Sequence, residues 1–246
     1  EKIAQTATFI YASSTYIALY DRRYWPPSLG LVGLLILWTV IAARKKPMWY
    51  IATAALIGLS LHLHLSLLLF IPFVAYALFV SFRAKQIHWP VVLGIIGAYL
   101  AITSPLLVYD LLHNADNLKA PFALVTSQGG TLIPSLGAHV VTAMAVLARV
   151  WNSTTPLNGF DALLYLFLSL LALILCLRTT QYPALKTVGG VITMFLVAFM
   201  LYPGRIQEYY LAGMLPFMAI AMGLLLLQTP KLIRVLVIIA YLTINA

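Results

Sequence analysis

The segment Ser104-Pro-Leu-Leu-Val-Tyr-Asp-Leu-Leu-His-Asn114 ends a long apolar run with three polar side chains. An acid is costly in hydrocarbon, so the Asp110 carboxylate is expected at a membrane interface or in a wet cavity. His113 follows three residues later, on the same helical face. Apolar hairpins precede this segment, and the one long polar insert follows it. We therefore expect the segment to form one edge of a functional site.

The composition of the whole chain indicates an integral membrane protein. Of its 246 residues, 63% are hydrophobic and 9% charged, and the mean hydropathy is +0.98. Average soluble domains have about 45–50% apolar and about 25% charged residues. Only helices and closed barrels satisfy the backbone in lipid, and the apolar runs here are continuous. We expect an all-α membrane protein with residues 1–246 forming a single polytopic transmembrane domain.

The apolar runs predict about nine transmembrane helices, at 3–19, 29–43, 49–61, 65–82, 91–112, 162–177, 188–201, 211–227 and 233–245. Prolines, glycines and polar clusters interrupt the insert at about 113–160. We expect this insert to be an outer loop with one interfacial helix at 136–151. The chain starts without a methionine and ends inside an apolar run, so we expect a fragment truncated at both ends.

The charges predict the orientation of the helices. A net charge of +9 in a membrane protein indicates cytoplasmic loops before it indicates nucleic-acid binding. On the predicted topology most bases lie inside, at Lys2, Arg44, Lys45, Lys46, Arg83, Lys85, Arg178, Lys186, Lys231 and Arg234. All acids except Glu1 lie outside, at Asp21, Asp110, Asp116, Asp161 and Glu208. We therefore expect the functional site on the non-cytoplasmic side of the membrane.

Two groups of polar residues on the predicted outer face are candidates for phosphate binding. Asp21, Arg22 and Arg23 place two guanidinium groups beside one carboxylate. Arginine binds phosphate oxygens through two parallel hydrogen bonds, so these residues form either a lipid-phosphate clamp or an anchor for ordinary headgroups.

The second group is Arg205, Glu208, Tyr209 and Tyr210, which follow a Pro-Gly turn. Arg205 is a candidate for a phosphate, and the other three are candidates for a hydroxylated donor or acceptor. The alternative is a salt-bridged loop with a tyrosine belt at the headgroup level.

His62 and His64 are two residues apart, so on a helix they point to different sides and form no i, i+4 metal pair. Histidines in a membrane segment need polar partners. They are expected either to line a cavity that binds sugar or phosphate, or to form hydrogen bonds between helices. The single cysteine, Cys176, excludes a disulfide framework and a thiolate metal site, and no nucleotide-binding motif is present.

The order and spacing of four motifs resemble those of the GT-C polytopic glycosyltransferases. The nearest branch is that of the protein O-mannosyltransferases and the lipid A aminoarabinose transferase. The motifs are Tyr20-Asp-Arg-Arg-Tyr-Trp-Pro-Pro-Ser28, His62-Leu-His64, Ser104 to Asn114, and Glu208-Tyr-Tyr-Leu with Pro216. The resemblance covers most of the chain and implies transfer of a sugar from a polyprenyl-phosphate carrier to a lipid, glycan or protein acceptor, usually with inversion.

The resemblance also implies that the principal base is a carboxylate in the first outer loop, after the first transmembrane helix. We expect that segment upstream of this chain, which leaves the catalytic base unassigned and Asp110 as a supporting candidate. No cofactor is required, although a divalent cation bound through the phosphate stays open. The alternative function is a transporter or flippase of lipid-linked saccharide or polysaccharide, although the internal repeats typical of transporters are not evident.

Overall fold

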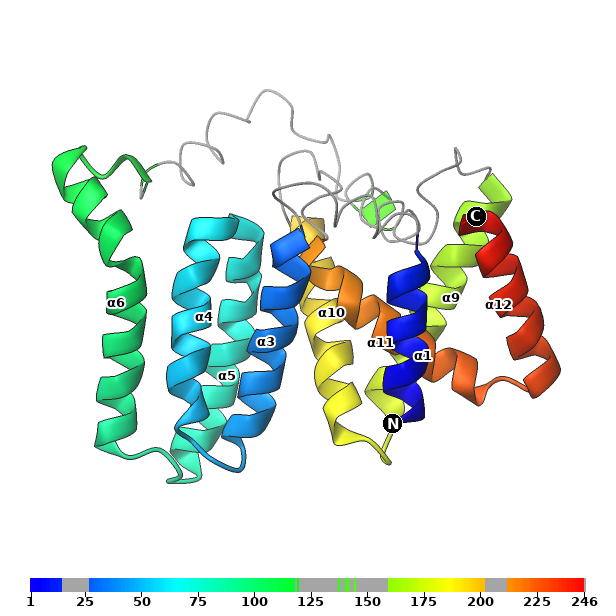
Figure 1. Ribbon diagram of the computed structural model, residues 1–246, viewed down its shortest axis with the longest axis horizontal. Coiled ribbons are helices and arrows are strands. Elements are labelled where there is room, and N and C mark those ends of the chain that lie inside the picture. The colour runs from blue at the N-terminus through cyan, green and yellow to red at the C-terminus, as the bar shows by residue number, and fades with distance from the viewer. Residues whose placement is uncertain are drawn as a thin grey trace. The chain divides into compact units, whose positions relative to one another are not determined.

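The computed structural model describes residues 1–14, 27–117, 159–201 and 212–245, with isolated positions at 119, 137, 140, 141 and 144. In this part of the chain every regular element is a helix, in agreement with the all-α prediction (Figure 1). The interfacial helix predicted at 136–151 lies outside the described residues, apart from four isolated positions.

The described helices are α1 (Lys2–Ser13), α3 (Pro27–Ala43), α4 (Trp49–Leu63), η1 (Leu65–Leu69), α5 (Phe70–Arg83), α6 (Trp89–Leu112), α9 (Gly159–Arg178), α10 (Pro183–Leu201), α11 (Leu215–Gln228) and α12 (Lys231–Asn245). Most of their ends lie within a few residues of the predicted ones. Several begin at a proline, which has no N–H to leave unpaired in the first turn. Pro27 therefore starts α3, and Pro183 starts α10 five residues before the predicted start.

Three helical segments of the described chain are long and apolar enough to cross a membrane, namely Ser66–Arg83, Trp89–Leu112 and Pro183–Leu201. The first combines η1 with α5. Four shorter apolar helical stretches, of 10–17 residues, are Leu29–Ala43, Trp49–Leu63, Leu166–Arg178 and Ala212–Gln228. The structure therefore supports membrane-spanning helices, whereas the total of nine crossings stays a prediction.

The contacts between helices divide the chain into two compact units. Unit 1 contains α1, α9, α10, α11 and α12, and unit 2 contains α4, η1, α5, α6 and all but the start of α3. Each unit is described separately below.

In unit 1 the central helix is α11, which packs against α1, α9 and α10. It is apolar on all sides, and nearly all of its residues are buried, as expected for a helix with no polar face. Gly223 lets the backbones of α11 and α1 approach closely, because a Cβ there would lie 3.1 Å from the Ala7 nitrogen and 3.2 Å from the Ile3 carbonyl oxygen. Small residues at such contacts let helix backbones pack closely.

Two polar side chains fix α12 in unit 1. The Tyr241 hydroxyl donates a hydrogen bond to the Ile10 carbonyl in α1, at 2.9 Å. The Arg234 guanidinium donates to the carbonyls of Leu226, Leu227 and Thr229, at 2.8, 2.9 and 3.0 Å. These carbonyls lie at the C-terminal end of α11, where the Leu226 carbonyl also accepts from the Thr229 N–H and hydroxyl, and a cation there offsets the negative end of the helix dipole.

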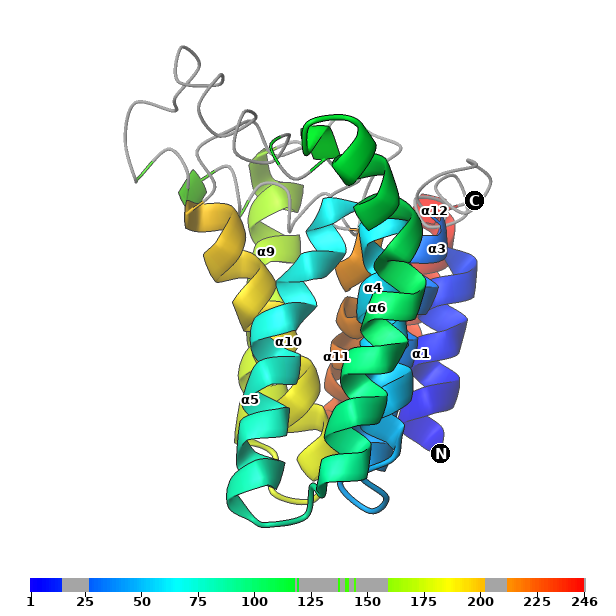
Figure 2. The same ribbon diagram turned by 90° about the vertical axis from the view of Figure 1, so that its left-hand side faces the viewer.

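In unit 2 the central helix is α4, which packs along α6 and contacts η1 and α5. Ile51 lies against Gly94, and Gly58 lies against Ile102, so α4 and α6 run in the same direction (Figure 2). The two glycines, one on each helix, permit this close packing.

Buried hydroxyl groups join α4 to α5 and to α3. The Tyr50 hydroxyl donates to the Ala77 carbonyl in α5 at 3.0 Å and lies 2.8 Å from the Ser81 hydroxyl. On the side of α3, the Thr53 hydroxyl donates to the Thr39 hydroxyl at 2.9 Å. In lipid such hydrogen bonds contribute about 0.6 kcal/mol each, and they fix which faces meet.

The end of α5 has an unusual backbone conformation at Lys85. Its φ of 55° lies in the left-handed region, and it donates its N–H to Phe82 while Gln86 donates to Ser81. This pair of bonds is the Schellman arrangement, in which the left-handed residue is usually glycine. A residue with a Cβ in that conformation costs about 1–2 kcal/mol.

Candidate functional site

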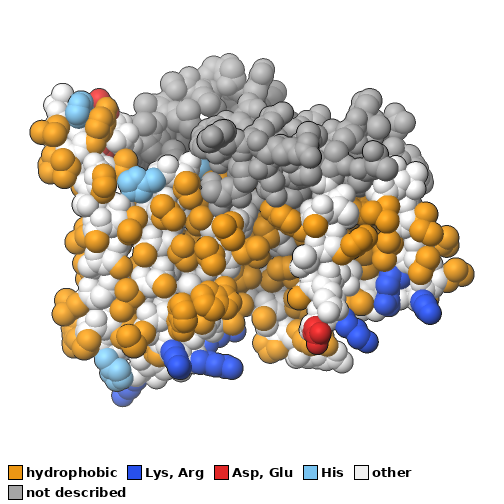
Figure 3. All heavy atoms as spheres, viewed as in Figure 1, with side chains coloured by type: hydrophobic (Ala, Val, Ile, Leu, Met, Phe, Trp, Pro, Cys, Tyr) orange, Lys and Arg blue, Asp and Glu red, His pale blue; other side chains and the backbone are white. Residues whose placement is uncertain are grey.

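Basic side chains lie at one end of unit 2, and the candidate site residues lie at the other end. The basic end of unit 2 is formed by the α3–α4 and α5–α6 loops, with Arg44, Lys45, Lys46, Arg83 and Lys85 (Figure 3). The polar end of unit 2 contains the four candidate residues that the structure describes there, His62, His64, Asp110 and His113. Because successive helices alternate in direction, the ends of α4 and α6 both lie at the polar end (Figure 1).

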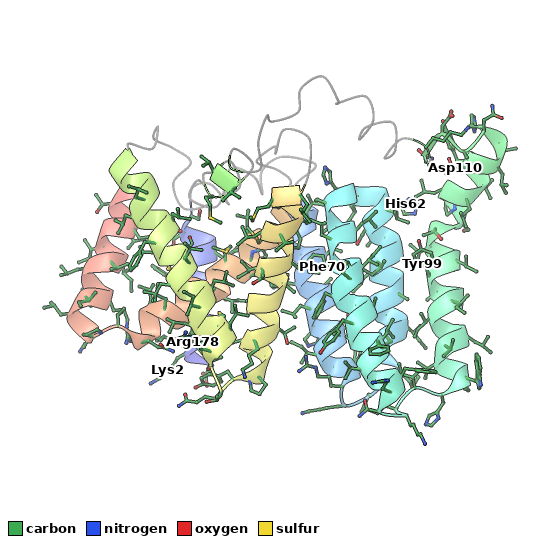
Figure 4. All side chains as sticks on the ribbon, turned by 180° about the vertical axis from the view of Figure 1, so that it is seen from behind. Lys2, His62, Phe70, Tyr99, Asp110 and Arg178 are labelled. Carbon is green, nitrogen blue, oxygen red and sulfur yellow. The ribbon has the colours of Figure 1, made fainter. Side chains whose placement is uncertain are left out.

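His62 occupies the last turn of α4 and points toward α6 (Figure 4). Its Nε2 atom lies 2.8 Å from the Ile102 carbonyl oxygen and therefore donates to it. His62 thus forms a hydrogen bond between helices, which was the alternative to cavity lining.

Pro105 explains why side chains bind carbonyls of α6 at this level. A proline has no N–H, so the Ala101 carbonyl four residues earlier has no backbone donor, and the proline ring pushes that turn open. The Ser104 hydroxyl donates to the Ala101 carbonyl at 2.8 Å, beside the carbonyl that His62 binds. The Ser-Pro pair in an apolar run was the sequence signal for this arrangement.

His64 lies in the connection between α4 and η1, where its side chain caps η1. Its Nδ1 atom accepts a hydrogen bond from the Ser66 N–H at 3.0 Å and lies 2.8 Å from the Ser66 hydroxyl. Burial lowers the pKa of His64 from its ordinary value. The imidazole is therefore neutral at pH 7, and because Nδ1 accepts, the proton is on Nε2. Ser66 was missed in the sequence, although the His-x-Ser spacing is typical of a capped turn.

Asp110 and His113 have separate partners at the end of α6. The Asp110 carboxylate accepts a hydrogen bond from the Asn117 N–H at 2.8 Å. The His113 Nδ1 atom donates to the Tyr109 carbonyl at 2.9 Å, and its ring stacks on Tyr109 with centroids 4.0 Å apart. Although Asp110 and His113 share a helical face, no contact between their side chains is found among the described residues. Tyr109 orients the imidazole instead.

The chain makes a tight reversal after α6, and the Asp110 carboxylate stabilises it. Asn114 and Ala115 both have left-handed φ values, of 56° and 61°. The Ala115 N–H donates to the Asp110 carbonyl at 2.8 Å, so Asp110 contributes both its backbone and its side chain to the turn. This turn sends the chain back from α6 into the polar insert.

The four candidates of the polar end do not form one cluster. His62 contacts α6 at Ile102, eight residues before Asp110, which corresponds to about 12 Å along a helix at about 1.5 Å per residue. Figure 4 shows the two labelled side chains at different levels of α6. The structure therefore joins His62 to the Pro105 turn and Asp110 to the reversal beyond it.

The remaining candidates lie outside the described residues. They are Asp21, Arg22, Arg23, Arg205, Glu208, Tyr209 and Tyr210. The predicted phosphate clamp therefore stays a prediction. Within the described ranges, no group of three or more His, Cys, Asp or Glu side chains lies close enough to hold a metal ion.

The fold and these contacts define an α-helical protein with helices long and apolar enough to span a membrane. Comparisons with protein-family models, curated proteins and solved structures found no match to the chain. Its family is therefore argued below from its residues.

Proposed function

We propose that this chain forms part of a GT-C type membrane glycosyltransferase. It transfers a sugar from a polyprenyl-phosphate donor to a lipid, glycan or protein acceptor on the non-cytoplasmic face of a bacterial-type inner or plasma membrane. The supporting observation is the separation of the basic and polar ends of unit 2. Bases mark the cytoplasmic side of membrane proteins, so polar groups at the other end face the non-cytoplasmic side.

The proposed reaction needs a base and a cationic phosphate site. The base removes the proton of the acceptor hydroxyl as its oxygen forms a bond to the anomeric carbon of the sugar. The bond from that carbon to the phosphate oxygen breaks, and polyprenyl phosphate leaves with the bonding electrons. Arg22, Arg23 and Arg205 are proposed to stabilise the charge that develops on this phosphate.

The described histidines have different parts in this proposal. His64 is neutral and accepts from the Ser66 N–H through Nδ1, so it stabilises the start of η1 beside the proposed site rather than removing a proton. His62 positions α6 through the Ile102 carbonyl. Asp110 is proposed to support the site through the reversal after α6, and the principal base is left unassigned.

The test is transfer by the complete gene product in proteoliposomes. Radiolabelled polyprenyl-phosphate sugars are supplied with candidate acceptors, and both labelled product and released polyprenyl phosphate are measured. The proposal expects equal amounts of the two. Movement of the intact donor across the bilayer without a covalent product would instead identify a transporter.

The phosphate clamp is tested at limiting donor. Replacing Arg22, Arg23 or Arg205 by Ala is expected to reduce donor use, and Lys is expected to rescue only partly because it cannot form two parallel hydrogen bonds. Lys186→Gln, which removes an exposed base of unit 1, is the matched control. Normal turnover in all three Ala variants would contradict the clamp.

A further inference from the structure

The basic end of unit 2 is held together by packing, so its charges occupy a defined surface. Tyr50 ties the start of α4 to the last turns of α5 through Ser81, at 2.8 Å. Trp38 and Trp49 pack edge to face with centroids 4.7 Å apart, which ties α3 to α4 beside the same loops. The α3–α4 and α5–α6 loops therefore belong to one rigid end of the unit.

No carboxylate neutralises this surface within unit 2. Between residues 27 and 117 the only acids are Asp110 and Asp116, and both lie at or beyond the far end of α6. Lys45, Lys46, Arg83 and Lys85 are exposed. In unit 1, by contrast, the Arg234 guanidinium donates hydrogen bonds to three carbonyls of its own unit.

The second observation is the conformation of Lys85. Its left-handed backbone is one that glycine adopts without a steric penalty, and glycine is the usual residue at this position of a helix end. The lysine side chain makes no hydrogen bond or ion pair within the described part of the chain that would offset this strain. Strained backbone conformations often mark functional sites, and the exposed ammonium group is what this lysine supplies and glycine would not.

Apolar side chains adjoin these charges and favour a lipid over a soluble anion. Phe82 and Trp89 flank the α5–α6 loop and are 65% and 77% exposed. The Arg83 guanidinium lies over the Phe79 ring, 5.3 Å from its centroid. Exposed aromatic rings beside lysine and arginine are typical of the level where headgroups meet acyl chains. A free phosphate ion would gain nothing from these rings.

We propose that the basic end of unit 2 binds anionic phospholipid headgroups and that the Lys85 ammonium group makes part of this contact. The phosphate oxygens lie at Lys45, Lys46, Arg83 and Lys85, and the acyl chains run along the exposed faces of α5 and α6. This site is separate from the proposed sugar-transfer site, because it lies at the opposite end of the same helices.

The test measures lipid preference of the full chain in vesicles. Brominated phosphatidylglycerol or brominated phosphatidylcholine, with identical acyl chains, is included in phosphatidylcholine vesicles, and quenching of tryptophan fluorescence is recorded. Trp38, Trp49 and Trp89 lie at or near the basic end, so they report lipid bound there. The proposal expects stronger quenching by phosphatidylglycerol, reduced at high salt, with no competition from millimolar inorganic phosphate.

Lys85→Gly separates this role from a structural one. The variant is expected to have a higher thermal midpoint, because the strain is relieved, and a preference for phosphatidylglycerol lower by about fivefold. Lys186→Gln, which removes an exposed base of unit 1, should leave the preference unchanged. The double variant Lys45→Gln/Lys46→Gln, in the other loop, should lower the preference further than Lys85→Gly.

Three results would overturn the proposal. They are an unchanged preference in both Lys85→Gly and the double variant, an equal loss in Lys186→Gln, and full competition by inorganic phosphate. An unchanged preference in both variants would show that these lysines do not contact lipid. An equal loss in Lys186→Gln would show attraction by charge in general. Full competition by inorganic phosphate would identify a site for a soluble anion.

Discussion

At the scale of single residues, His64 caps η1 and is expected to make the stability of the protein depend on pH. It lies between α4 and the predicted span that begins at Ser66, and burial lowers its pKa from the ordinary 6.5. The unfolded chain therefore takes up a proton at a higher pH than the folded protein does. Stability from this residue is present above about pH 6.5 and is lost as the pH falls toward the lowered folded pKa.

We therefore expect His64→Asn to reduce the fall in stability between pH 7.5 and pH 5. An asparagine side-chain oxygen accepts from the Ser66 N–H as Nδ1 does, but it has no proton to take up. Unfolding in mixed micelles over this pH range measures the effect, and His88→Asn, at an exposed histidine, is the matched control. An equal pH dependence in wild type and His64→Asn would contradict the assignment.

Asp110 has a structural role that the structure shows and a functional role that is proposed. Asp110→Ala leaves the Asn117 N–H without its acceptor and is expected to cost about 0.5–2 kcal/mol, as loss of a helix cap does. Asp110→Asn keeps an acceptor oxygen and should cost less. Denaturation midpoints of the two variants measure this difference.

The activity of Asp110→Asn then decides the functional role. If the carboxylate contributes charge to the proposed site, sugar transfer falls strongly while expression and stability stay close to wild type. Near-normal transfer would limit Asp110 to the reversal after α6.

At the scale of helices, two glycines differ in the space around them: Gly223 lies in a close contact between helices, whereas Gly190 faces open space. Gly223 in α11 faces backbone atoms of α1, at 3.1 and 3.2 Å from an added Cβ, and backbone cannot move aside as a flexible side chain can. Gly190 in α10 has no atom within 4 Å of an added Cβ. The same substitution should therefore have opposite effects at the two positions.

Gly223→Ala is expected to destabilise unit 1 by about 1–3 kcal/mol through overpacking. Gly190→Ala is expected to stabilise it by up to about 1 kcal/mol, because alanine is the better helix former. The free energies of unfolding in mixed micelles test both. Stabilisation by Gly223→Ala would show that α1 and α11 are not in close contact.

At the scale of the whole molecule, the membrane orientation rests on the opposed ends of unit 2. The 24 residues of α6 span about 36 Å, which exceeds a hydrocarbon core of about 30 Å. A helix of this length places Trp89 and Leu112 on opposite sides. In the proposed orientation the basic end faces the cytoplasm and the reversal after α6 faces outward.

This orientation predicts the labelling of single cysteines introduced after Cys176→Ala. Asp116→Cys, at an exposed position, should react with a membrane-impermeant maleimide in intact cells. Lys46→Cys, in the exposed α3–α4 loop, should react only after the membrane is opened. Labelling of both from the same side would contradict the orientation and the proposed non-cytoplasmic site.

Much of the local structure could be predicted from the sequence. Helix ends followed from prolines, basic clusters and the limits of the apolar runs, as at Ala43, Trp49 and Leu112. The helical spacing of His62 and His64 does not explain their different partners, because α4 ends at Leu63 and His64 lies in the connection that follows it. The partners of these residues could not be predicted, because a histidine in an apolar run is compatible with a ligand, a neighbouring helix or its own turn.

The sequence by itself determined that the described part of the chain is helical, with helices apolar enough to span a membrane, bases in their loops and polar groups at selected helix ends. Only the tertiary structure decided that α11 is buried at the centre of unit 1, whereas α6 is exposed along most of its length, up to 86% at Leu111. Both helices are apolar on all sides. Lipid tails are as apolar as leucine, so composition does not distinguish a helix that faces lipid from one that faces protein. Packing at small residues and hydrogen bonds between helices make that distinction, and they exist only in the assembled fold.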